Sequence, residues 1–327
     1  MKISHNSLNP FEEAAAKMPS LISAFEGFVR KQASAFSKDV RQIARDTIAP
    51  KGKYIRPILA FSSAGKDAKK SQSLVRRAAI AELIHLSTLI HDDVIDNASV
   101  RRNAATPNKK YGAHTAILLG DAMFARTIQL AYEENDNEIL GKIAECVRTI
   151  CEGEIVQTLV NREKNISKKQ YFRSVYGKTG VLFELACFMG AKCANFKGGE
   201  WVSCATFVGR QLGIAYQIYD DVCDWFMSEA DAGKTLGTDL ASGKHTLPLI
   251  ILLEKLPARR ARELEKNLSS QDPRELVRLM SELGVAAECR AEFARRIRTA
   301  ENSLSKFGDF GQPLSVFCAC MRKLDFA

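Results

Sequence analysis

Apolar residues recur three and four positions apart along most of this chain, a spacing that places them on one face of an α-helix. The pattern begins near the N-terminus with a stripe of four residues, Leu21, Phe25, Phe28 and Val29. Further helical stretches cover residues 54–96, 111–133, 138–162, 168–194, 200–228, 258–268 and 285–306. No segment alternates with the period of a β-strand, and no linker divides the chain. The pattern predicts an all-α protein with a central helical bundle, formed as a single domain over residues 1–327.

Two polar stretches interrupt the helical pattern. Residues 97–109 contain a proline and are predicted to form a loop. Residues 229–245 are rich in Gly, Lys, Asp and Thr, and are predicted to form a functional loop or lid. Nearer the C-terminus, Asp272 followed by Pro273 predicts the start of a helix, and Gly284 predicts its end.

The composition favours a small anionic substrate. Of the 327 residues, 46% are hydrophobic and 26% are charged, which is typical of a globular protein with a sizeable core. The formal net charge of +9 favours an anionic partner. We expect no nucleic acid, because the chain has neither a recognised binding motif nor a basic run interleaved with aromatic residues.

The cysteines and the absence of long apolar stretches bear on localisation. Nine cysteines without a CxxC pair indicate buried, reduced thiols rather than a disulfide framework or a zinc site. The N-terminus lacks an apolar secretory segment, and no stretch reaches the roughly 18 apolar residues of a membrane span. We therefore expect a cytoplasmic protein without a transmembrane segment, for which peripheral contact with a membrane stays open.

Two short acidic patterns share the same form. Asp92-Asp93-Val94-Ile95-Asp96 and Asp220-Asp221-Val222-Cys223-Asp224 each place three aspartates at relative positions 0, 1 and 4. On a helix these positions share a face, and each pattern follows an apolar stretch. Carboxylates packed together repel one another, which implies a cation between them. Oxygen-only ligands suit Mg²⁺, which proteins commonly share with substrate phosphates, so two facing clusters would clamp a diphosphate through bridging metals.

Basic residues accompany both acidic patterns. Lys53 and Arg56 stand three residues apart beside a glycine turn, and His85 precedes the first pattern by about two helical turns. The whole basic set is Lys53, Arg56, His85, Arg101, Arg102, Lys178, Lys234 and Lys244. Arginine binds phosphate oxygens in a bidentate manner and lysine supplies a movable charge, so the set suits a diphosphate.

The order of these motifs resembles that of the trans-isoprenyl diphosphate synthases, also called polyprenyl synthetases. The matching stretches are KGKYIRP (51–57), ELIHLSTLIHDDVID (82–96), VRR (100–102), LLGDAMFA (118–125), GEIVQ (153–157), YGKTGVLFELA (176–186), GIAYQIYDDVCD (213–224) and GKTLGTDLASGKHTLP (233–248). The resemblance implies a single helical bundle around a central cavity (the isoprenoid synthase type I fold), Mg²⁺ as cofactor with Mn²⁺ as a substitute, and a homodimer. Three departures concern loop geometry: Lys51 stands where a second glycine is common, Tyr54 where a basic residue is common, and Asn103 where glycine is usual.

The resemblance also implies a reaction and residue roles. The reaction is the head-to-tail (1'-4) condensation of isopentenyl diphosphate with an allylic prenyl diphosphate, giving an all-trans polyprenyl diphosphate. Six aspartates would bind the magnesium ions that hold the allylic diphosphate: Asp92, Asp93, Asp96, Asp220, Asp221 and Asp224. The diphosphate of isopentenyl diphosphate would be held by Lys53, Arg56, His85 and Arg102. The allylic diphosphate would contact Arg101, Lys178, Lys234 and Lys244, while Thr179 and Gln217 would line the reacting centre.

Product length is predicted from the residues just before the first acidic pattern. The growing chain would extend from Asp92 along its helix, so Ser87 and Thr88 would form the floor of the cavity. Both are small, whereas short-chain members of the family usually carry a bulky aromatic residue there. The sequence therefore resembles the medium- and long-chain synthases, although a neighbouring helix around Met123-Phe124 could set the floor instead.

Four other interpretations stay open at this stage. One is a short-chain (farnesyl or geranylgeranyl) diphosphate synthase, and another is a non-catalytic subunit of a heteromeric synthase. Such a subunit would be expected to lose aspartates or lysines, and this chain keeps them. A class I terpene cyclase would not need the KGKYIRP stretch or the second acidic pattern. A metal-buffering helical protein would not need the ordered basic residues.

Overall fold

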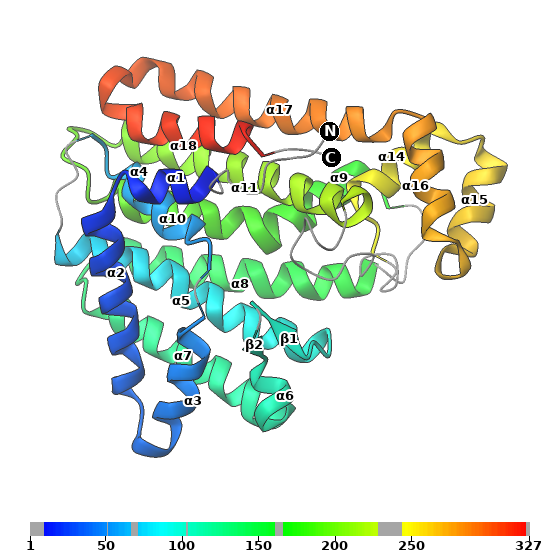
Figure 1. Ribbon diagram of the computed structural model, residues 1–327. Coiled ribbons are helices and arrows are strands. Elements are labelled where there is room, and N and C mark those ends of the chain that lie inside the picture. Colours follow the sequence, from blue (N-terminus) through cyan, green and yellow to red (C-terminus); the bar gives the residue numbers. More distant parts are fainter. Residues whose placement is uncertain are drawn as a thin grey trace. The chain divides into compact units, whose positions relative to one another are not determined.

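The computed structural model describes residues 10–50, 52–66, 71–102, 104–160, 166–227 and 244–324, and most of these are helical (Figure 1). They form two compact units. The first takes in the described residues of Met1–Val147, Leu182–Gly209 and Leu304–Cys320, and the second those of Arg148–Val181, Arg210–Ser303 and Met321–Ala327. The predicted all-α class is confirmed, and the single domain over 1–327 stays a prediction.

The elements fall into three groups. The first unit contains α1 (Pro10–Ala16), α2 (Pro19–Gln32), η1 (Ala33–Ala35), α3 (Lys38–Ile48), α4 (Ile55–Ser63), α5 (Gln72–Ile95), β1 (Val100–Arg101), β2 (Ala104–Ala105), α6 (Pro107–Tyr111), α7 (Ala113–Tyr132) and η4 (Ser305–Gly311). The second contains α9 (Lys168–Val175), the π-helical turn η2 (Tyr176–Gly180), α14 (Leu247–Lys255), α15 (Ala258–Lys266), η3 (Leu268–Ser270) and α16 (Pro273–Glu282). Helices with residues in both units are α8 (Asn137–Val160), α10 (Val181–Ala191), α11 (Glu200–Phe226), α17 (Val285–Leu304) and α18 (Gln312–Arg322).

Helix α5 is the central element of the first unit, where it packs against α2, α4 and α7 (Figure 1). It starts at an N-cap, because the Ser71 side chain accepts a hydrogen bond from the Leu74 backbone N–H at 3.0 Å. Ile80, Leu83 and Ile84 are buried in its middle, which is apolar on nearly all sides. The packing therefore holds the last turn of α5, which carries Asp92, in a fixed place within this unit.

The loop predicted over residues 97–109 contains regular structure, so that prediction was wrong in part. Strand β1 pairs antiparallel with β2, with Val100 opposite Ala105. Helix α6 follows at once, capped by Thr106, whose hydroxyl accepts a hydrogen bond from the Lys109 backbone N–H at 3.1 Å. The hairpin turns at Arg102, which adopts a left-handed backbone conformation with φ of 50°. Arginine stands at this position instead of the glycine that usually adopts such a conformation in a hairpin turn, so the sequence did not indicate the turn.

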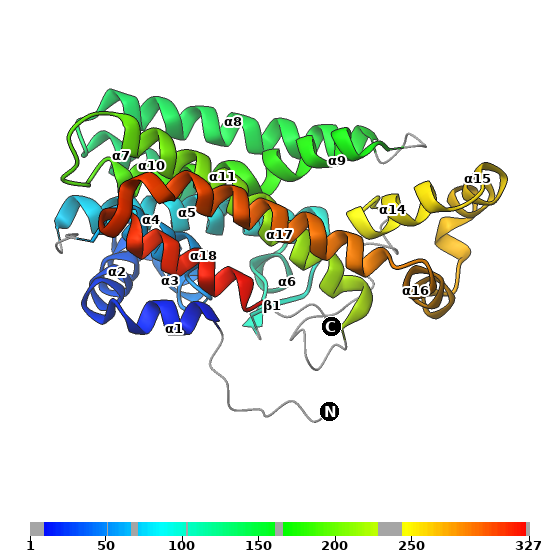
Figure 2. The same cartoon turned by 90° about the horizontal axis from the view of Figure 1, so that it is seen from above.

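In the second unit, α14 packs against α9, α15 and α16, and the group of α14, α15 and α16 is visible in Figure 2. The predicted start of α16 is confirmed, since the Asp272 carboxylate accepts a hydrogen bond from the Arg274 backbone N–H at 2.9 Å. The predicted end is confirmed as well, because Gly284 follows the helix with φ of 67°, a conformation that glycine adopts without strain.

Candidate active site

The first acidic cluster, Asp92, Asp93 and Asp96, lies at the C-terminal end of α5. Asp93 is buried, at 2% exposure, and Asp96 is the exposed C-cap residue. The C-terminal end of a helix carries partial negative charge from its unpaired carbonyl groups, so carboxylates there are unfavourable unless a cation compensates them. The position of the cluster therefore supports a function in binding cations rather than a contribution to stability.

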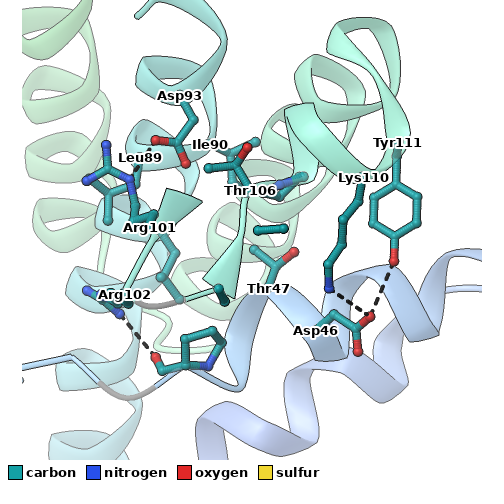
Figure 3. Close-up of a pocket in the computed structure, with 15 residues that line it drawn as sticks. Asp46, Thr47, Leu89, Ile90, Asp93, Arg101, Arg102, Thr106, Lys110 and Tyr111 are labelled. Carbon is teal, nitrogen blue, oxygen red and sulfur yellow. Dashed lines mark hydrogen bonds and ion pairs between the residues drawn. The ribbon is translucent and has the colours of Figure 1, made fainter. Parts of the chain in front are cut away.

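Arg101 faces the buried carboxylate of this cluster. Its Nε donates a hydrogen bond to Asp93 Oδ1 at 2.6 Å, from strand β1 across the end of α5 (Figure 3). Burial raises the pKa of Asp93, and the positive charge of Arg101 opposes that rise. The hairpin thus brings a cation to the first acidic cluster, and Arg101 lies where a residue that contacts a metal-bound diphosphate is expected.

A cavity of about 50 Å³ opens beside this ion pair (Figure 3). Its walls include Asp93 and Arg101, together with apolar side chains of α5 such as Leu89 and Ile90. On the far wall, α3 and α6 meet at Asp46, whose carboxylate accepts a hydrogen bond from the Tyr111 hydroxyl at 3.3 Å. The candidate site is therefore accessible to small polar groups from this side of the first unit.

Three of the predicted ligands of isopentenyl diphosphate lie close together. Burial lowers the pKa of His85 well below its usual range, and the positive charges of Arg56 and Arg102 lower it further. His85 is therefore a neutral hydrogen-bonding group at neutral pH, surrounded by permanent cations. The guanidinium of Arg56 lies over the Phe183 ring, 5.3 Å from its centroid. Lys53 lies exposed, two residues before the start of α4, which carries Arg56.

Arg102 is held by several contacts at once. Its Nη1 donates a hydrogen bond to the Pro50 carbonyl at 3.3 Å, and its Nη2 lies 3.7 Å from Glu82 Oε1. The guanidinium also packs on Gly52, where an added Cβ would lie 2.6 Å from Nη2. A side chain larger than that of glycine at position 52 would therefore collide with the guanidinium of Arg102 in this orientation.

The second acidic cluster, Asp220, Asp221 and Asp224, belongs to a chain of hydrogen bonds in the second unit. Asp221 accepts from the Tyr171 hydroxyl at 2.6 Å and from Gln217 Nε2 at 2.8 Å. Gln217 in turn accepts from the Thr179 hydroxyl at 2.7 Å. Asp221 and Asp224 are buried, at 4% and 6% exposure. The structure thus brings Thr179 and Gln217 to the second cluster.

Lys178 and Thr179 lie in the π-helical turn η2, a type of irregularity that occurs frequently at functional sites. Lys178 Nζ donates a hydrogen bond to Glu154 Oε2 of α8 at 3.0 Å. The two backbones approach closely, since an added Cβ on Gly177 would lie 3.2 Å from the Cα of Gly153. These two glycines allow the contact that fixes Lys178.

Lys244, like Lys178, is a predicted contact of the allylic diphosphate, and it also lies in the second unit. Two residues further on, the Thr246 hydroxyl accepts a hydrogen bond from Trp225 Nε1 at 2.9 Å. Trp225 directly follows the second acidic cluster on α11, so this bond places Lys244 near the end of that helix. Lys234 lies outside the described residues, as does most of the loop predicted over 229–245.

The predicted floor residues lie on α5. Ser87 is buried, at 4% exposure, and its hydroxyl donates to the Leu83 carbonyl at 3.1 Å. The Thr88 hydroxyl donates to the His85 carbonyl at 2.8 Å. Both hydroxyls are satisfied by the helix itself, so these positions present small, effectively apolar surfaces.

The donor chemistry of both clusters fits a magnesium ion shared with substrate. Among the residues that the structure describes, no three carboxylate, imidazole or thiol groups already form a closed ion site. Mg²⁺ is usually held by one or two carboxylates together with water and substrate phosphates, and aspartate oxygens are suitable donors. Asp92, Asp93 and Asp96 in the first unit, and Asp220, Asp221 and Asp224 in the second, could each supply such a partial set.

Residues 37–283 match the family model described as polyprenyl synthetase. The chain belongs to this family. The octaprenyl diphosphate synthase of Escherichia coli (strain K12) is 35% identical over 214 residues, which are 64% of this chain and 65% of that protein. The all-trans-nonaprenyl-diphosphate synthase (geranyl-diphosphate specific) of Rhodobacter capsulatus is 32% identical over 248 residues, 74% of each chain. The match to the first of these relatives thus spans less than two thirds of its length.

Solved structures of polyprenyl synthetases share the fold over nearly the whole chain. A decaprenyl diphosphate synthase from Rhodobacter capsulatus superposes with a TM-score of 0.87 at 26% identity, covering 97% of this chain and 100% of that one. A polyprenyl synthase from Caulobacter crescentus CB15, complexed with calcium and isoprenyl diphosphate, gives a TM-score of 0.87 at 25% identity and covers 99% and 100%. The isoprenoid synthase fold implied by the motifs is thereby confirmed.

The sequence did not indicate three residues that make clear contacts in the candidate site. Glu82 and Glu154 both lie inside stretches that match the family, but an acidic side chain is not expected to bind a diphosphate. Tyr171 lies outside those stretches, and its bond to Asp221 joins residues 50 positions apart. No local signal could have found Tyr171, since its function depends on the packing of α9 against α11.

Proposed function

We propose that this protein is a magnesium-dependent trans-prenyltransferase, which condenses isopentenyl diphosphate head to tail (1'-4) with an allylic diphosphate. The observation that carries the proposal is the position of both acidic clusters at the C-terminal ends of apolar helices. Arg101 contacts the first cluster, and Thr179, the neighbour of Lys178, is joined to the second cluster through Gln217. Carboxylates gathered there need cations, and arginine and lysine side chains bind phosphate oxygens. A metal-bound diphosphate satisfies both requirements. The named activities of the relatives support the same reaction, with an all-trans product of medium to long chain.

The two diphosphates are proposed to bind to different residues. Lys53, Arg56, His85 and Arg102 hold the diphosphate of isopentenyl diphosphate. Neutral His85 contributes a hydrogen bond, while the arginines supply charge that does not depend on pH in the physiological range. The allylic diphosphate is bound through the six aspartates and through Arg101, Lys178, Lys234 and Lys244.

The reaction needs a good leaving group more than it needs a base. Bound Mg²⁺, or Mn²⁺ in its place, would neutralise charge on the allylic diphosphate and so assist the cleavage of its C–O bond. Arg101 and Lys178 stabilise the negative charge that develops on the departing diphosphate. C4 of isopentenyl diphosphate then forms the new bond to C1 of the allylic group, and the proton lost from C2 passes to the released diphosphate. Thr179 and Gln217 line the reacting centre, and neither needs to act as a base.

Elongation of labelled isopentenyl diphosphate tests this proposal directly. The purified protein would be incubated with Mg²⁺ and with geranyl, farnesyl or geranylgeranyl diphosphate as primer. We expect a series of products that ends at one polyprenyl length after dephosphorylation and chromatography. Absence of elongation with every primer would contradict the proposal and favour a non-catalytic subunit of a heteromeric synthase. A single addition to a short primer would favour the short-chain alternative.

Ser87→Phe should shorten the final product by at least one isoprene unit. Ser87 is buried on α5 before Asp92, so a phenyl ring there would fill the space into which the growing chain extends. The added bulk should cost about 1–3 kcal/mol of folding stability, which a thermal melt would register. Ser87→Ala is the control, since it removes the hydroxyl without adding volume and should leave product length unchanged. An active Ser87→Phe enzyme with the original product length would show that another helix sets the floor.

The proposed homodimer would form through an exposed apolar stripe on α7. Ile117, Leu118, Ile128 and Tyr132 are 44%, 55%, 42% and 78% exposed. Ile128 lies about three helical turns after Ile117, and Tyr132 about four turns after Leu118, so the four share one side of the helix. Exposed apolar patches of this kind commonly mark interaction sites, and a second copy offers a surface of the same chemistry.

Leu118→Asp should raise the dissociation constant of the dimer on the order of a hundredfold, because a symmetric interface would then bury two unpaired carboxylates. Light scattering over a range of concentrations would measure this. Leu159→Asp is a matched control, since Leu159 is also 55% exposed but lies on α8 in the other unit. A monomeric wild-type protein, or equal weakening by both variants, would contradict the proposed interface.

A cytoplasmic location is part of the proposal. All nine cysteines are free, and Cys146 and Cys187 are among those buried, as expected in a reducing compartment. Across the part of the chain that the structure describes, no helix combines the length and the apolar character needed to cross a bilayer.

A further inference from the structure

Glu82 is a buried carboxylate within the cationic group proposed to bind isopentenyl diphosphate. It lies on α5, three residues before His85, and is 3% exposed. Burial raises the pKa of Glu82, whereas the positive charges of Arg56 and Arg102 lower it, so both guanidinium groups act on this carboxylate. Arg102 Nη2 lies 3.7 Å from Glu82 Oε1. A site that binds a diphosphate would not be expected to contain a buried carboxylate, so the presence of Glu82 requires an explanation.

The guanidinium of Arg102 is held by tertiary contacts. The backbone of Arg102 forms the turn of the hairpin, with φ of 50°. Its side chain contacts different parts of the chain: Glu82 on α5, the Pro50 carbonyl after α3, and Gly52 beneath the guanidinium. Of the three, only Glu82 carries a charge opposite to that of Arg102.

The surroundings of Arg102 leave it room to move. The cavity of about 50 Å³ seen in Figure 3 is lined by Arg102, Pro50 and Leu86. A second cavity, of about 40 Å³, is lined by the same three residues and also by Glu82 and Tyr54. The bond from Arg102 to Pro50 therefore belongs to the walls of both cavities. A long side chain beside open space on more than one side needs a directional partner to keep one orientation.

Tyr54 does not compete for the Glu82 carboxylate. Burial raises the pKa of Tyr54 to about 12, and the negative charges and hydrogen bonding of Glu26 and Glu82 contribute to that rise. Its side-chain hydrogen bond goes to Glu26, on α2. The charge of Glu82 is therefore available to the two arginines.

We infer that Glu82 is a positioning residue for substrate binding, whose carboxylate fixes the guanidinium of Arg102 in the orientation that receives the diphosphate of isopentenyl diphosphate. This inference rests on the proposed function. It also makes a prediction about sign. Direct repulsion between Glu82 and a bound diphosphate would weaken binding, so removal of the charge would tighten it. If Glu82 positions Arg102, removal of the charge must weaken binding.

Glu82→Gln tests the sign with almost no change of shape. We expect the KM for isopentenyl diphosphate to rise roughly tenfold or more, as when a residue that orients a ligand-binding group is lost, while the KM for the allylic primer stays within about twofold. Glu134→Gln is the matched control. Glu134 is another buried carboxylate, with a side chain 2% exposed, and it pairs with Arg77 at the other end of α5. That variant should lower the melting temperature and leave both KM values within about twofold. An unchanged or lowered KM for isopentenyl diphosphate in Glu82→Gln would overturn the inference.

A double-mutant cycle shows whether Glu82 acts through Arg102. If it does, Glu82→Gln should change the KM by less than about twofold once Arg102→Gln is present. Independent, multiplicative effects would overturn the inference. If Arg102→Gln alone leaves the KM unchanged, the proposed function of Arg102 fails, and the positioning role fails with it. If Arg102→Gln raises the KM and Glu82→Gln does not, only the inference fails.

Gly52→Ala tests whether the orientation of Arg102 affects substrate binding without removing a buried charge. It remains informative if Glu82→Gln folds poorly. The new Cβ would lie 2.6 Å from Arg102 Nη2, and the flexible end of that side chain is what would give way. We expect a rise in the KM for isopentenyl diphosphate in the same direction, with the melting temperature close to that of the wild type. An unchanged KM would show that the orientation of Arg102 does not matter and would overturn the inference.

Discussion

Asp93→Asn should lower the turnover of the proposed reaction roughly a hundredfold or more, while the protein stays folded. Asparagine has almost the same shape as aspartate but offers a metal only one neutral oxygen. Arg101 would lose its partner at 2.6 Å, but its side chain is 37% exposed, so water can solvate the freed charge. Turnover should be measured over a range of Mg²⁺ concentrations, where the variant should also require more metal.

Asp46→Asn is the control for this result. Asp46 lines the same cavity as Asp93, and its ion pair with Lys110, at 3.9 Å, is partly exposed. Partly exposed pairs contribute little, so this variant should keep its turnover within about twofold and its stability within about 1 kcal/mol. Equal losses of turnover in the two variants would mean that removing either carboxylate from the cavity has the same effect, so that the effect is not specific to Asp93. Unchanged turnover in Asp93→Asn would remove Asp93 from the proposed metal site.

Gly190→Ala should cost on the order of 3 kcal/mol or more of unfolding free energy, the largest stability effect that we expect from a single methyl group here. A Cβ at position 190 would lie 1.9 Å from the Ala60 carbonyl oxygen and 2.7 Å from its carbon. These are backbone atoms of α4, so no side chain can turn aside, and α10 and α4 would have to separate. Because α4 carries Arg56, the KM for isopentenyl diphosphate should rise as well. Urea unfolding would measure the stability.

Gly27→Ala is the matched control, made on α2 in the same unit. An added Cβ there would meet no atom within 4 Å. Alanine in place of a helical glycine should stabilise the protein by about 0.5–1 kcal/mol, because the unfolded chain loses freedom. The two substitutions should thus have opposite signs. Similar destabilisation by both would indicate that the close approach of α4 and α10 is not what requires glycine at 190.

Several features were predictable because their causes are local. The helical repeat of apolar residues, the cap at Asp272 and the stop at Gly284 all follow from hydrogen bonds between residues near in sequence. The spacing of Asp92, Asp93 and Asp96 places them on one helix face for the same reason. Arg56 and His85 were predicted together on the resemblance, and the structure brings them together.

The hairpin and α6 within residues 97–109 were not predictable in this way. Asn97 and Arg102 both adopt left-handed backbone conformations, with φ of 49° and 50°, and neither is the glycine that signals such a turn. Strands of two residues are also too short to show an alternating pattern. What holds the segment is tertiary, such as the hydrogen bond from the Thr106 hydroxyl to the Ala98 carbonyl at 2.7 Å.

The sequence by itself determined the helical class, the two acidic clusters and the chemistry that they favour, because residue type and helical periodicity act over a few positions. Only the tertiary structure decided which side chains meet: Arg101 and Asp93 at the first cluster, Tyr171 and Asp221 at the second, and Glu82 and Arg102 in the group proposed to bind isopentenyl diphosphate. The last two pairs join residues 50 and 20 positions apart on separate elements. Such contacts depend on how helices pack, and helix packing is fixed by many side chains at once, so no short stretch of sequence encodes them.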